Sequence, residues 1–112
     1  MITAAGVRRL ALVEPAAYEA DHHGFPSYRV GGKIFATLPD LQRLHVMVGE
    51  NEIHAWVAEQ PAAYQPYWWG QRLACLRVHL DPAEPAHVAE LLHEAWSRKA
   101  PRRLTRDRRG SG

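Results

Sequence analysis

The sequence of 112 residues contains a single cysteine, Cys75, and no long uninterrupted run of apolar residues. One cysteine excludes an internal disulfide framework and a cysteine-rich zinc site. A membrane-spanning helix needs about 18 or more consecutive apolar residues, so we expect no contact with a membrane. The first residues also lack the basic start and apolar core of a signal peptide, which favours a cytoplasmic protein.

The composition, by contrast, is that of a folded domain. Hydrophobic residues make up 46% of the chain and charged residues 23%, a balance that is typical of globular proteins and not of disordered ones. A chain of this length fits one domain, which we place at residues 1–104, and we expect a monomer.

Charge is divided unevenly along the chain. The formal net charge is +2, but residues 98–112 hold seven basic residues and one acidic residue, so the rest of the chain carries −4. A basic end of this kind attracts phosphates or any acidic surface without sequence selectivity. We therefore treat residues 105–112 as a flexible basic tail, which either binds an anionic partner or simply keeps the protein soluble.

Three helices are predicted from capping residues and apolar spacing. Thr3 can cap the first helix, which Pro15 ends, and Asn51 can cap the second. In residues 88–96 the apolar side chains recur at the spacing of an amphipathic helix, and Pro101 stops this third helix.

Strands are predicted where apolar and polar residues alternate. Residues 27–30 and 33–38 form two strands joined by a Gly-Gly turn, and residues 44–48 and 76–80 alternate in the same way. The polar stretch before residue 27 has room for a short edge strand. The short connections make neighbouring strands antiparallel. The sequence therefore predicts an α+β domain with one antiparallel sheet of about five strands, covered on one face by three helices in the order helix–strands–helix–strand–helix.

Residues 61–70 are predicted to form an aromatic loop, since two prolines and one glycine lie among four large rings. The rings are Tyr64, Tyr67, Trp68 and Trp69. Exposed rings beside Arg72 could stack on bases or form a pocket for a small ligand or peptide. The alternative is that they plug one end of the sheet, because large rings dominate the core of a small domain.

A metal site is not predicted, although the chain has seven histidines. His87, Glu90 and Glu94 share one side of the third helix, but a metal needs three or four converging ligands. Glu94 also lies four residues before Arg98, which favours an ordinary ion pair on a solvated helix face. We expect no cofactor.

No group of residues indicates an enzyme. Adjacent His22 and His23 would point to opposite sides of a strand, and Asp21 could orient one of them as a base only in a cleft. Cys75 lies in an apolar alternating segment, where an unpaired cysteine is usually a buried small hydrophobe. We therefore expect a protein without catalytic residues.

Three segments together resemble one family. The first is Gly24-Phe25-Pro26-Ser27-Tyr28-Arg29-Val30-Gly31-Gly32-Lys33 with the strand that follows, and the second is Tyr64-Gln65-Pro66-Tyr67-Trp68-Trp69-Gly70. The third is the end of the last helix with Ala100-Pro101-Arg102-Arg103-Leu104. In this order they resemble the MmcQ/YjbR-like family of small bacterial proteins. The resemblance implies an α+β domain that binds DNA through a double wing of β-hairpins, without catalytic residues. The chain departs from the family at Leu73-Ala74-Cys75, where members often carry a Gly-Trp pair.

We therefore predict a non-enzymatic DNA-binding protein. Phosphates would contact cations of the hairpins, chiefly Arg29 and Lys33 and also Arg43 and Arg77. The aromatic rings would stack on bases, and the basic tail would add unspecific attraction. The alternative is a module that binds a small ligand or a protein through the Tyr/Trp segment and the sheet face. The predicted nucleic-acid contacts are Arg29, Lys33, Tyr67, Trp68, Arg72, Arg102, Arg103 and Arg106.

Overall fold

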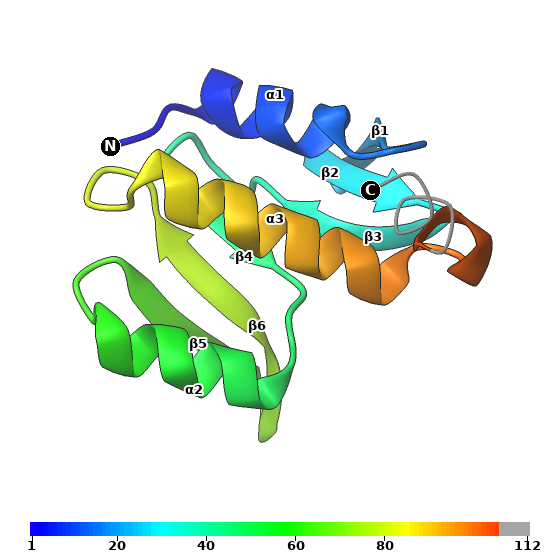
Figure 1. Ribbon diagram of the computed structural model, residues 1–112. Helices are drawn as coiled ribbons and strands as arrows, with labels where there is room; N and C mark the ends of the chain where they lie inside the picture. The colour runs from blue at the N-terminus through cyan, green and yellow to red at the C-terminus, as the bar shows by residue number, and fades with distance from the viewer. Residues whose placement is uncertain (106–112) are drawn as a thin grey trace.

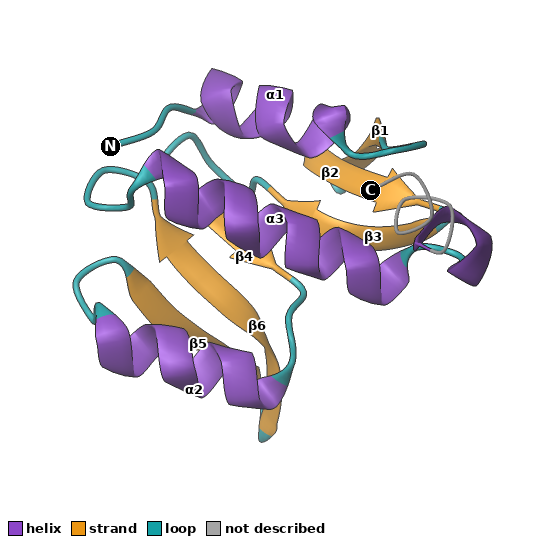
Figure 2. Cartoon of the chain, viewed as in Figure 1, coloured by secondary structure: helices purple, strands orange, loops and turns teal. Residues whose placement is uncertain are grey.

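The computed structural model describes residues 1–105, which form a six-stranded antiparallel sheet with helices on one side (Figures 1 and 2). This confirms the predicted α+β class. No helix in this part of the chain has the length and apolar character needed to span a bilayer. The elements are α1 (Ala4–Val13), β1 (Tyr18–His22), β2 (Phe25–Val30), β3 (Lys33–Thr37), β4 (Arg43–Val46), α2 (Glu50–Glu59), β5 (Tyr64–Trp69), β6 (Arg72–His79) and α3 (Pro85–Lys99).

The strands lie in the order β1-β2-β3-β4-β6-β5, and every neighbouring pair is antiparallel. The prediction of an aromatic loop at residues 61–70 was wrong, because Tyr64–Trp69 is the edge strand β5. Pro66 interrupts a strand pattern in the sequence, yet an edge strand accommodates it because one side of the strand has no partner to receive an N–H. The partner strand β6 also begins earlier than predicted, at Arg72.

The helix caps follow the sequence in one case and depart from it in another. Thr3 caps α1 as predicted, and its Oγ1 accepts a hydrogen bond from the Gly6 N–H at 3.1 Å. The N-cap of α2 is Gly49 and not Asn51, which lies inside the helix. A Cβ on Gly49 would lie 2.8 Å from Oε2 of Glu52, so the glycine leaves room for this carboxylate at the positive helix end.

One hydrophobic core lies between the sheet and the three helices. It contains residues from α1, α2, α3 and the inner face of the sheet, such as Val7, Ile53, Leu76 and Trp96. Trp96 is fully buried and donates from Nε1 to the Pro15 carbonyl at 2.9 Å, which ties α3 to the end of α1. The helices cover the inner face, and no helix of residues 1–105 lies on the opposite, outer face of the sheet (Figure 2).

Candidate nucleic-acid interface

Two β-hairpins project from the same end of the sheet. The β2–β3 hairpin turns at Gly31 and Gly32, and the β5–β6 hairpin turns at Gly70, all with positive φ. One row of paired residues crosses the sheet through Ala36, Val46, Leu76 and Pro66, and both turns lie on the same side of this row. The strand β4 ends between the two hairpins, so each extends as a separate two-stranded arm (Figure 1).

The β2–β3 turn gathers cations that are far apart in the sequence. A Cβ on Gly31 would lie 3.0 Å from Cγ of Pro101, so the C-terminal segment packs directly on the turn. The helical turn that follows Pro101 exposes Arg102 and Arg103, and Lys33, the first residue of β3, is also exposed. Three of the predicted contacts therefore lie at or beside the β2–β3 turn, whereas Arg106 lies outside the described residues.

Arg29 and Lys33 lie on opposite faces of this hairpin. Lys33 pairs with the buried Val30, so it belongs to the helix-covered side. Arg29 lies on the outer face, where its Nε donates to Oγ of Ser27 at 2.9 Å and its Nη2 to the Asp21 carbonyl at 3.3 Å. The sequence placed both cations on one hairpin, but the pairing register separates them.

The outer face of the sheet carries arginines and no carboxylate from its strands. Residues that pair directly share a face, and one outward row runs through Ser27, Thr37, His45 and Arg77. Of the two acidic strand residues, Glu19 pairs with the buried Tyr28 and bonds Arg8 of α1, and Asp21 follows on the same side. Within residues 1–105, the outward strand positions thus hold four arginines, which are Arg29, Arg43, Arg72 and Arg77.

The clearest organised group on this face is formed by Arg77, His45 and Tyr67. Nε of Arg77 donates to Nε2 of His45 at 3.2 Å, and its Cζ lies 4.6 Å from the centre of the Tyr67 ring. The Tyr67 and His45 rings are 4.4 Å apart at a 33° tilt. Two neighbours therefore orient the guanidinium, and in residues 1–105 it has no carboxylate partner. Its terminal nitrogens are available to an anion.

His45 is neutral in this group. Burial, and then the nearby Arg77 charge, lower the pKa of His45 from 6.5 to about 4. An unprotonated Nε2 can accept the hydrogen bond from Arg77, so the positive charge of the group belongs to the arginine. Sequence reasoning missed His45, since only the register of β4 against β6 shows that it faces Arg77.

The rings of β5 divide between the two faces of the hairpin. Tyr67 pairs with Cys75 and Trp69 with Arg72 on the outer face, whereas Trp68 pairs with Leu73, which packs against the core. Trp69 is 69% exposed and Trp68 50% exposed. Sequence reasoning selected Trp68 and passed over Trp69, because strand alternation was not considered for a segment assigned to a loop.

Several histidines and carboxylates were considered in the sequence as catalytic or metal-binding groups and rejected, and the structure shows the local contacts of some of them. Oδ2 of Asp21 accepts the Gly24 N–H at 3.3 Å and so shapes the turn after β1, in which His23 has a φ of 55°. Residues 1–105 contain no group of three or more metal-ligating side chains. Arg98, predicted to pair with Glu94, donates instead to the Met47 carbonyl at 3.0 Å.

Cys75 is buried beneath this face, as the sequence predicted. Burial raises the pKa of its thiol from 9.0 to about 11, so the sulfur is protonated at neutral pH. A protonated, buried thiol is a poor nucleophile. The cysteine therefore acts as a small apolar side chain beside Tyr67, with which it pairs.

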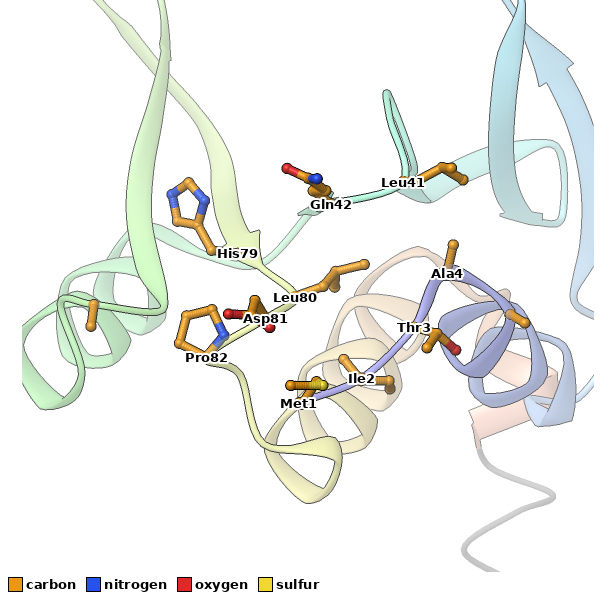
Figure 3. Close-up of a pocket in the computed structure, with 12 residues that line it drawn as sticks. Met1, Ile2, Thr3, Ala4, Leu41, Gln42, His79, Leu80, Asp81 and Pro82 are labelled. Carbon is orange, nitrogen blue, oxygen red and sulfur yellow. The ribbon is translucent and has the colours of Figure 1, made fainter.

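A cleft of about 760 Å³ lies at the other end of the sheet, where β4 begins and β6 ends (Figure 3). Ile2, Leu41, Leu80 and Pro82 supply much of its apolar lining. The Ile2 N–H donates to the Leu80 carbonyl at 3.1 Å, which fixes the N-terminal segment along one wall. This cleft is separate from the aromatic residues of β5.

The fold and this open face define a small α+β domain with a cationic sheet surface, and comparison with known proteins assigns its family. The family model described as YjbR matches residues 12–98, and the chain belongs to the YjbR family. This confirms the resemblance seen in the sequence.

A solved structure of the same fold supports this assignment. The crystal structure of Deinococcus radiodurans protein DR2400, described as a DUF419 domain, is similar with a TM-score of 0.72. The match covers 90% of this chain and 83% of that chain at 16% sequence identity, which establishes a shared fold alone. No curated protein matches the sequence.

Proposed function

We propose that this protein is a DNA-binding domain without a catalytic centre, and that the outer face of the sheet is its DNA interface. One observation carries the proposal: the outward positions of the strands hold four arginines and no carboxylate within residues 1–105. Residues 1–97 carry a net charge of −4, which by itself opposes the binding of DNA to this part of the chain. Most of the acidic side chains responsible belong to helices, other loops and the inner side of the sheet, away from this face. Asp40, in the loop before β4, is the exception among residues 1–105, since its Oδ2 lies 3.6 Å from Nε of Arg43 and offsets part of that charge.

Arginine is suited to this role because its planar guanidinium can donate two hydrogen bonds to one phosphate. Arg77 is held by His45 and Tyr67, and Arg29 by Ser27, so both are ordered before DNA arrives. Less conformational entropy is then lost on binding. The cations at the β2–β3 turn and the basic tail add longer-range attraction.

Fluorescence anisotropy of labelled DNA, in single-stranded and duplex form, tests the proposal. Arg29→Ala and Arg77→Ala each remove a phosphate contact, so each should weaken binding about tenfold at low salt. Arg9→Ala is the matched control, because it removes an exposed arginine from α1 on the helix-covered side. If all three variants bind as the unaltered protein does, or if no DNA binds, the proposal is wrong.

The second candidate is a module that binds a small apolar ligand or a protein segment through β5 and the sheet face. The exposure of Trp68 and Trp69 favours it, because large rings at a surface often mark interaction sites. Such a ligand would bind with the same affinity at all salt concentrations, and the arginine substitutions would have little effect. DNA anisotropy that falls steeply with salt favours the first candidate. A change in tryptophan fluorescence on addition of a ligand, with the same affinity at all salt concentrations, favours the second.

A further inference from the structure

We propose that the outer face of the β5–β6 hairpin binds an unpaired DNA strand, with a base stacked on Trp69 and a backbone phosphate on Arg77. This inference rests on the proposed DNA-binding function and names the state of the DNA that the face selects.

Trp69 is the ring that is free to stack on a base. It is 69% exposed on the outer face, beside the exposed Arg72 with which it pairs. Tyr67 faces the same way two residues earlier, but its ring is already covered by His45 and by the Arg77 guanidinium. Tyr67 therefore positions Arg77, and Trp69 offers the open aromatic surface.

The spacing of the two groups indicates an extended ligand. Arg77 pairs with Gln65, four residues before Trp69 on β5. At about 3.3 Å per residue, the ring and the guanidinium are attached about 13 Å apart along the hairpin. A strand that runs along the hairpin reaches both groups, with Arg72 next to the stacked base.

The same geometry favours an unpaired strand over a duplex. In a duplex, each base is covered on both sides by its neighbours, so a ring on a sheet surface has no free base face to contact. An unpaired strand offers those faces, and open sheets that combine cations with aromatic rings are suited to it. No carboxylate at the outward positions of β4, β5 or β6 repels its phosphates.

Anisotropy with one labelled oligonucleotide, alone and annealed to its complement, tests this inference on the full chain. The single strand should bind at least about tenfold tighter than the duplex. Trp69→Ala should weaken single-strand binding about five- to 150-fold, the range expected for loss of one stacked base, and should leave duplex binding within about twofold. Trp69→Phe should retain most of the affinity, because it keeps an aromatic ring.

Trp68→Ala is the matched control, since it removes the same side chain from the neighbouring position on the opposite face. It should leave single-strand binding unchanged, and urea unfolding of each variant checks that the fold is intact. Equal losses for Trp68→Ala and Trp69→Ala, or a duplex bound as tightly as the single strand, would overturn the inference. If DNA binds and depends on Arg77 but not on Trp69, only this inference fails. If no DNA binds, the proposed function fails with it.

Discussion

At the scale of single residues, the outer face depends on an arginine that is held in place without a carboxylate. The Arg77 guanidinium lies against the Tyr67 ring and donates to His45, which is neutral at neutral pH. A carboxylate in the same place would also orient the arginine, but it would neutralise the charge that attracts a phosphate. The neutral state of His45 is therefore central to the face, and it can be measured.

The lowered pKa of His45 should make the fold less stable in mild acid. Between pH 6.5 and about 4, the unfolded chain binds a proton at this histidine and the folded chain does not, so stability falls as the pH falls through this range. His45→Gln removes that proton uptake and keeps an acceptor for Arg77. We expect the stability difference between the two proteins to change by about 2 kcal/mol between pH 7 and pH 4, allowing for partial solvent screening. Urea unfolding across pH measures it, and parallel pH profiles for the two proteins would show that His45 titrates normally.

At the scale of elements, the two hairpins at the end of the sheet are supported differently. The β2–β3 turn is braced by Pro101, which brings the Arg102 and Arg103 segment to it. The β5–β6 turn has open space around Gly70 and carries exposed tryptophans. The first hairpin therefore presents exposed cations around a braced turn, and the second presents exposed rings.

A pair of glycine substitutions tests the bracing by Pro101. Gly31 and Gly32 both have positive φ, so alanine at either position costs about 1–2 kcal/mol of stability in backbone strain. Only at Gly31 would the new methyl group meet Pro101, at 3.0 Å, whereas Gly32 has nothing within 4 Å. Gly31→Ala should therefore lower the free energy of unfolding more than Gly32→Ala and weaken DNA binding through displacement of Arg102 and Arg103. Equal losses of stability would mean that the Pro101 contact contributes little.

The elements also show which parts of the fold the sequence could predict. The apolar spacing of residues 88–96 predicted α3, and the Gly-Gly pair predicted the β2–β3 turn, because each signal is local. The strand β5 was missed because Pro66 and the clustered rings resemble a loop unless the strand is known to lie at an edge. The early start of α2 depends on the close approach of Glu52 to Gly49, which spacing alone does not reveal.

The candidate site was harder to predict than the fold, because it depends on register. Shifts in pairing occur between Tyr28 and Arg29 and between Tyr67 and Trp68, and a shift of one residue exchanges the two faces of a strand. The sequence singled out arginines and aromatic rings as candidate residues. It could not show that Arg29 shares a face with Arg77 and not with Lys33, or that Trp69 and not Trp68 faces outward.

At the scale of the whole molecule, net charge is a poor guide to binding. Residues 1–97 carry −4, yet most of the acidic residues lie among the helices and loops, while four arginines lie on the outer face, where Asp40 pairs with Arg43 alone of the four. A potential that differs between two faces orients the molecule toward a polyanion even when the total charge is unfavourable. The body of the domain should therefore bind DNA by itself, without the basic tail.

The most direct test of this account is a salt titration of DNA binding by a chain truncated after Leu104. The truncated protein should still bind, and the logarithm of its affinity should fall linearly with the logarithm of salt concentration. Replacing both Arg29 and Arg77 by alanine should reduce the steepness of that line by about 1.4 for a single strand, since each phosphate contact contributes about 0.7. If only the full chain binds, the basic tail attracts DNA. If the double substitution leaves the slope of the truncated chain unchanged, another surface of residues 1–104 binds DNA. Either result would show that the sheet face is not the interface.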